Sequence, residues 1–121
     1  MSVRPGPPPP PLTPQARAAA AARGVRARQM RAQVRGGLAD GSIPVGDVLR
    51  DSKVHDERGR VLARMKVVEL LSSFRGIGPG RAADIMDAIG IAANRRVGGL
   101  GPRQAAEIIH LIAARYPGSP G

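Results

Sequence analysis

The stretch FRGIGPGRAADIM, residues 74–86, joins a glycine-rich turn directly to an amphipathic helix. Its three glycines permit positive φ angles and the close approach of another backbone; they are Gly76, Gly78 and Gly80. Pro79 suits the first turn of a helix, where no intrahelical hydrogen bond needs its missing N–H. A loop of small residues that opens a helix presents free amides and the positive end of the helix dipole. The stretch therefore predicts a turn suited to a phosphate.

The helix after this turn has one apolar face, because apolar residues recur at i, i+3, i+4 and i+7: Ala82, Ile85, Met86 and Ile89. The pattern returns 23 residues later in GLGPRQAAEII, residues 99–109, with the matching face Ala105, Ile108, Ile109 and Ile112. Each turn is followed by proline, two alanines and an acid, and each carries an arginine, Arg81 or Arg103. The arginines favour two phosphate-binding turns over two turns that serve close helix packing alone.

Composition places the chain among small basic proteins. Its 121 residues suffice for one small domain with appendages, and one Phe, one Tyr and no Trp imply an aliphatic core. The absence of cysteine excludes disulfides and thiolate chemistry and fits a reducing cytoplasm. No apolar run is long enough for a membrane span. A net charge of +10, carried by arginine everywhere except Lys53 and Lys66, indicates a polyanionic partner.

The charge is concentrated at the start of the chain, where residues 1–39 hold seven arginines and no acid. Thr13-Pro14 predicts a helix start, and the Ala/Arg/Gln-rich residues 14–38 predict one basic helix that Gly36-Gly37 ends. Four of its arginines fall within about 60° of one another on a helical wheel: Arg17, Arg28, Arg31 and Arg35. Arg23 and Arg26 point elsewhere. Because this helix has no acids, we expect its stripe to attract an anion.

The rest of the chain contains no strand pattern, so we expect an all-α protein. Residues 1–13 form a proline-rich tail that we expect to be disordered. Residues 39–60 are expected to hold a short helix from Pro44 to Ser52 and a charged loop from Lys53 to Gly59. Residues 61–116 form a compact domain of three helices: Leu62 to Ser73, the helix that ends at Gly90, and Arg103 to Arg115, which Pro117-Gly118 stops. Residues 117–121 form a second disordered tail.

Catalysis finds little support in the sequence, and we expect no enzyme, no cofactor and no metal. His55 and His110 lack metal-ligand spacing, and Asp84 and Asp87 resemble solvated surface residues. A single Phe and a single Tyr cannot build a platform for stacked single-stranded bases, and Phe74 follows the apolar spacing of a core residue. A duplex binder that grips phosphates remains, and such contacts do not read sequence.

A series of ordered motifs over residues 14–115 resembles the actinobacterial (mycobacterial-type) integration host factor family. They are Met65-Lys66-Val67, Leu70-Leu71, Gly76-Ile77-Gly78, Ile85-Met86, Ile91-Ala92, Arg95-Arg96, Gly99-Leu100-Gly101 and Arg103-Gln104. The resemblance implies a long basic helix followed by a compact helix-two-turn-helix domain related to a small-subunit ribosomal protein. It also implies a monomeric, nucleoid-associated protein of the cytoplasm that binds and bends double-stranded DNA, organises the chromosome and supports phage integration.

Carried over onto this sequence, the resemblance implies a phosphate-binding turn at Gly76, Gly78 and Gly80, with Lys66 and Arg81 beside it. Arg95 and Arg96 match the family's paired arginines, and Arg103 belongs to the second turn. Gly98 departs from the pattern, because family members commonly have a further arginine there, and duplex affinity or bending could be weaker. The main alternative is RNA binding, since the related ribosomal protein shares the Gly-Ile-Gly turn. A fragment of a repair glycosylase comes third.

Overall fold

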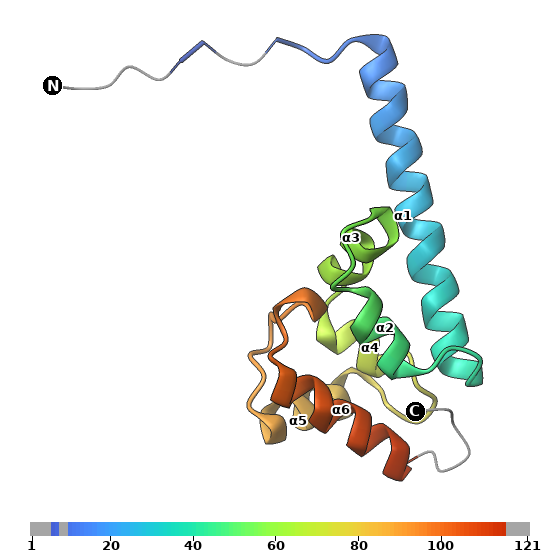
Figure 1. Cartoon of the computed structure of the whole chain (residues 1–121), viewed down its shortest axis with the longest axis vertical. Coiled ribbons are helices and arrows are strands. Elements are labelled where there is room, and N and C mark those ends of the chain that lie inside the picture. The colour runs from blue at the N-terminus through green and yellow to red at the C-terminus, as the bar shows by residue number, and fades with distance from the viewer. Residues whose placement is uncertain (1–5, 8–9, 116–121) are drawn as a thin grey trace, which may run out of the picture.

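The structure is a computed structural model that describes residues 6–7 and 10–115. Every regular element in this part of the chain is a helix (Figure 1). The elements are α1 (Pro14–Asp40), α2 (Val45–Asp51), α3 (Glu57–Arg64), α4 (Val67–Ser72), α5 (Pro79–Ile89), the 3₁₀ turn η1 (Val97–Gly99) and α6 (Pro102–Arg115). The expected all-α class is confirmed. None of these helices has the length and apolar character needed to cross a lipid bilayer.

Helix α1 begins where the sequence predicts, because the Thr13 hydroxyl accepts a hydrogen bond of 3.0 Å from the amide of Ala16. The expected end at Gly36-Gly37 is wrong, and α1 continues to Asp40 before the left-handed Gly41, φ 82°. Gly37 is buried, and a Cβ there would lie 2.3 Å from the side chain of Ile43. Gly37 therefore serves close packing of the following segment and does not terminate the helix.

Helix α1 forms an arm, whose N-terminal part projects beyond the other helices and whose remaining part runs alongside them (Figure 1). Its buried residues are confined to the last two turns, at Val34, Gly37 and Leu38. Two ion pairs also hold it, Arg26 to Glu57 of α3 at 2.8 Å and Arg35 to Glu69 of α4 at 2.6 Å. The stripe arginine Arg35 is therefore paired, contrary to expectation, because its acidic partner comes from a distant segment.

The short helix expected after the arm is confirmed as α2, whose apolar residues Val45, Val48 and Leu49 are buried. The charged loop expected to reach Gly59 ends at Asp56, which caps α3 by accepting a 2.6 Å hydrogen bond from the amide of Gly59. Gly59 is buried, and a Cβ there would lie 1.9 Å from the Val54 carbonyl oxygen. This glycine lets α3 pack against the preceding loop.

The single helix expected over residues 62–73 is two helices, because the chain is extended at Met65 and Lys66. These two residues pair with the segment before η1: the Val97 amide donates to the Met65 carbonyl at 2.8 Å, and the Val67 amide donates to the Arg95 carbonyl at 3.0 Å. Lys66 and Arg96 thereby form an isolated antiparallel bridge. The break fixes Lys66 beside the paired arginines.

The two expected glycine turns lead into α5 and α6, and α5 ends at the left-handed Gly90, as expected. Pro117-Gly118, the expected stop of α6, lies outside the described residues, as does most of the terminal tails. The core is aliphatic apart from Phe74, and the expected apolar faces contribute to it. Its buried members are Val34, Leu38, Val45, Val48, Leu49, Leu62, Met65, Val67, Leu70, Leu71, Phe74, Ile77, Ala82, Ile85, Met86, Ile91, Val97, Leu100, Ile108 and Ile112, with Ile89, Ala105 and Ile109 packed against them.

Candidate nucleic-acid interface

The first glycine turn uses left-handed backbone at one glycine only. Gly76 has a φ of 82°, whereas Gly78 is the extended N-cap of α5 with a φ of −81°, and Gly80 lies within the first turn of α5. A Cβ at either Gly78 or Gly80 would meet no atom within 4 Å. These two glycines therefore leave open space in front of the helix start.

The start of α5 has the polarity of an anion site. Gly78 provides no side-chain cap, and the amides of Gly80 and Arg81 find no acceptor among the described residues. Free amides at the positive end of a helix dipole attract an anion, and the exposed Arg81 adds a full positive charge on the third residue. The geometry thus suits a phosphate at the first turn.

The second turn resembles the first in sequence but is held by side-chain hydrogen bonds from Gln104 and Lys53. Gln104 accepts a 3.1 Å hydrogen bond from the Gly101 amide and donates one of 3.2 Å to the Gly90 carbonyl. The Lys53 ammonium donates to the carbonyls of Gly98 at 3.0 Å and Leu100 at 3.5 Å. Lys53 thus stabilises the second turn by hydrogen bonds. The sequence gives no sign of this role, because its partners lie 45 and 47 residues away.

Arg103 lies on the second residue of α6 and pairs with Glu107 at 3.0 Å. Its side chain is 87% exposed, so the pair is weak and an anion in solution can compete for the guanidinium. Arg103 is therefore accessible, although the turn beside it offers fewer free amides than the first turn.

The paired arginines are exposed and anchored by backbone carbonyls. Arg95 donates to the Gly99 carbonyl at 3.2 Å, and Arg96 donates to the carbonyl of Arg64 at the end of α3. Carbonyl acceptors orient a guanidinium without neutralising it, so both side chains keep their full charge for an outside anion.

A hollow of about 360 Å³, here called the basic socket, collects charge from three separate segments. It is lined by Arg31 of the arm, Arg64, Met65, Lys66 and Glu69 around the α3–α4 break, and Arg96 before η1. Its one acid, Glu69, is held by Arg35 at 2.6 Å. Four cations therefore face one hollow, of which Arg31, Lys66 and Arg96 were predicted and Arg64 was not.

Lys66 precedes α4 and the first glycine turn follows this helix. Lys66 lines the basic socket, whose lining residues include none from the first turn. Arg75, at the start of the turn, lies near the end of α1. There hydrogen bonds from Ser42 and, more weakly, the charge of Arg75 hold the pKa of the Asp40 carboxyl below its ordinary value. The basic socket and the first turn are two distinct places.

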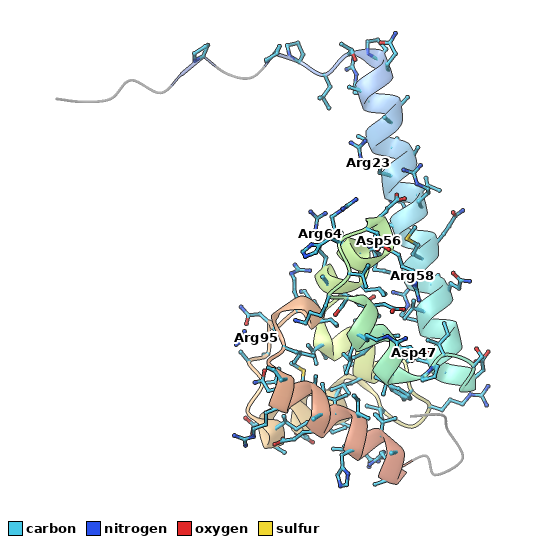
Figure 2. All side chains as sticks on the ribbon, viewed as in Figure 1. Arg23, Asp47, Asp56, Arg58, Arg64 and Arg95 are labelled. Carbon is cyan, nitrogen blue, oxygen red and sulfur yellow. The ribbon has the colours of Figure 1, made fainter. Side chains whose placement is uncertain are left out.

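The four arginines of the predicted stripe on α1 lie in different surroundings. Arg31 reaches the basic socket and Arg35 is bound to Glu69, whereas Arg17 and Arg28 are exposed on the arm. Figure 2 shows Arg23, Arg64 and Arg95 along one edge of the molecule, although they come from α1, α3 and the segment before η1. Basic side chains of the arm and of the domain therefore lie on the same side of the molecule.

Gly98, where the resemblance implied a further arginine, lies against Ala63 of α3. A Cβ at this position would lie 2.8 Å from the Cβ of Ala63 and 3.1 Å from its carbonyl oxygen. A side chain at residue 98 cannot be accommodated without movement of α3. Glycine at this position therefore permits the close packing of η1 on α3.

Comparison with known proteins gives consistent results. A family model for the S13-like H2TH domain matches residues 38–111. A protein named Integration host factor from Streptomyces coelicolor is 40% identical over 97 residues, covering 80% of this chain and 87% of the relative. Its namesake from Mycobacterium tuberculosis is 37% identical over 103 residues, covering 85% and 94%.

A solved structure of sIHF bound to an 8bp palindromic DNA matches with a TM-score of 0.64 at 34% identity. The match covers 78% of this chain and 97% of that chain. The shared fold, the level of identity and the nearly complete coverage of the relatives agree with the motifs of the sequence. The chain belongs to the integration host factor family of actinobacteria, built on an S13-like helix-two-turn-helix domain.

Proposed function

We propose that this protein is a nucleoid-associated architectural protein that binds double-stranded DNA through its phosphate backbone. The basic socket carries the proposal, because four cations from three segments converge there without an acid left to neutralise them. A net charge of +10 and the DNA held by the solved relative sIHF also support it.

The residues proposed to contact DNA fall into two groups. Arg31, Lys66 and Arg96 hold phosphates at the basic socket, with Arg95 beside them. The first turn holds another phosphate through the amides at Gly78 and Gly80 and through Arg81, while Gly76 gives the turn its shape. Arg103, Arg17 and Arg28 add charge around these sites. Arg35 acts mainly by fixing the arm through Glu69.

Contacts to phosphates position a protein on the duplex and carry no sequence information. We therefore propose largely sequence-independent binding, with DNA bending as the architectural effect and a preference for easily deformed duplexes. The protein acts as a monomer in the cytoplasm, at the nucleoid, and contributes to chromosome organisation and phage integration. It performs no catalysis in this role.

The decisive experiment neutralises Lys66, whose ammonium forms no ion pair or hydrogen bond with the described residues. Affinity for a short mixed-sequence duplex is measured by fluorescence anisotropy over a range of salt concentrations. Wild type should show a steep fall of affinity with salt, and Lys66→Gln should lower the log–log slope by about 0.9. Arg50→Gln is the matched control, since Arg50 is already paired with Asp47 and Asp51 and lies outside the basic socket.

Two outcomes would contradict the proposal. One is a wild-type affinity that barely changes with salt. The other is a structured RNA hairpin that displaces the duplex at a lower phosphate concentration than competitor DNA does, which would favour RNA as the ligand. Donor and acceptor dyes at the duplex ends report bending in the same titration, through a change in energy transfer on binding.

A further inference from the structure

A second basic hollow lies between the arm and the domain, where α1 crosses α3. It measures about 230 Å³ and is here called the arm groove. Its walls are Arg23, Gly24 and Ala27 of α1, and Glu57, Arg60, Val61 and Arg64 of α3. Arg64 also lines the basic socket, so the two hollows meet at this side chain.

The charges of the arm groove are unbalanced. Its acid, Glu57, is held by Arg26 at 2.8 Å, from outside the groove. Neither Arg23, Arg60 nor Arg64 forms an ion pair with a residue that the structure describes. All three are exposed, and Arg60 and Arg64 lie four residues apart, on one face of α3. Three free guanidinium groups therefore surround one opening.

The wall contributed by α1 is made of small residues. Gly24 lies in the middle of a helix, where glycine is unfavourable relative to alanine, and Ala27 follows one turn later. A larger residue at position 27 would project into the hollow, because Ala27 is one of its lining residues. These small residues leave the space of the groove unfilled.

We propose that the arm groove binds the sugar-phosphate backbone of the same duplex strand that enters the basic socket. The inference rests on the proposed function and adds Arg23, Arg60 and Arg64 as DNA ligands. A strand that leaves the basic socket at Arg64 runs between α1 and α3, so the arm and the domain hold one continuous backbone. Figure 2 shows Arg23 and Arg64 on the side of Arg95, in agreement with this course.

The first test removes charge from the groove. Arg23→Gln combined with Arg60→Gln should lower the log–log salt slope by about 0.9 for each arginine, and neither residue lines the basic socket. Between about 50 and about 200 mM salt, the affinity of the variant should then change about tenfold less than that of wild type. Arg58→Gln is the matched control, because Arg58 is on the same helix but outside the groove, facing Asp51 at 3.9 Å. Equal slopes for the variant and the control would overturn the proposal.

The second test blocks the groove without changing any charge. Ala27→Leu places a bulky side chain in the hollow and keeps a residue that favours helix, and Ala22→Leu adds the same bulk on the exposed arm outside it. Ala27→Leu should weaken duplex binding several-fold, and Ala22→Leu should not. If Ala27→Leu binds as wild type does, the arginines contact DNA elsewhere and the groove is not the site.

The results for the groove variants are compared with the salt slope of Lys66→Gln. A steep wild-type slope that Lys66→Gln reduces, with no effect from either groove variant, would reject the arm groove and leave DNA binding standing. A flat wild-type slope would reject both. Circular dichroism and thermal unfolding of each variant establish that the helices are intact.

Discussion

Gly78→Ser should separate stability from DNA binding at the first turn. Serine is a favoured N-cap residue, and its hydroxyl would accept a hydrogen bond from the amide of Gly80 or Arg81. A Cβ at residue 78 meets nothing within 4 Å, and a φ of −81° suits any L-residue. The substitution therefore introduces neither a clash nor backbone strain.

The magnitude follows from helix capping. Serine exceeds glycine as an N-cap by a few tenths of a kcal/mol, so the free energy of unfolding should rise by about 0.3 to 0.5 kcal/mol. The same hydroxyl occupies an amide that a phosphate would otherwise contact, and its bulk fills the space in front of the helix. We expect duplex affinity to fall several-fold while stability increases. Urea denaturation measures the stability, and anisotropy titration at fixed salt measures the affinity.

Gly76→Ala is the comparison, because Gly76 has a φ of 82°, which costs an L-residue about 1–2 kcal/mol. This variant should lose stability by that amount. Its duplex affinity should fall only to the extent that the altered backbone at residue 76 distorts the turn. The reasoning about the first turn would be refuted if Gly78→Ser were more stable and bound DNA as tightly as wild type. The amides at the start of α5 would then not be a phosphate site.

Three further predictions concern packing, the arm and selectivity. Gly98→Arg should destabilise the protein by about 1–3 kcal/mol in urea unfolding, because its Cβ would clash with Ala63, and Ala63→Gly should recover part of the loss. Deleting residues 1–30 should leave the domain folded and reduce the salt dependence of duplex affinity. Deleting residues 1–35 also removes the buried Val34, so the free energy of unfolding, measured by heat or urea, should fall by a further 1.5–3 kcal/mol, roughly. Selection from a random duplex library should give affinities that differ only several-fold, with flexible duplexes above stiff A-tracts, and a motif preferred by more than about 3 kcal/mol would contradict backbone recognition.

The helices and the core were largely predictable, because both depend on local patterns. Apolar spacing identified the faces of α2, α4, α5 and α6, and Thr13 and Gly90 marked two helix boundaries. The errors occurred where a distant segment decided the local structure. Gly37 was expected to end a helix and Gly59 to end a loop, but each is buried against a neighbouring segment and lies within a helix.

The candidate site was predictable in kind but not in arrangement. Its residue types follow from charge and motif, yet the break at Met65-Lys66 depends on hydrogen bonds to residues 95 and 97, about 30 positions away. That break places Lys66 in the basic socket. Arg60 and Arg64 were missed because the expected helix began at Leu62 and left Arg60 outside it, so their spacing of four on one helix face was not recognised.

The two turns show how one residue can make two copies of a sequence repeat differ. Position 81 of the first turn corresponds to position 104 of the second, and the residues there are arginine and glutamine. Glutamine can accept a hydrogen bond, so Gln104 folds back on the amide of Gly101. Arginine has no acceptor atom, so Arg81 cannot bind the corresponding amide of Gly78 in this way. The guanidinium that cannot cap the helix instead adds charge where a phosphate would bind. This single difference leaves the first turn with one more free amide for a phosphate than the second turn has.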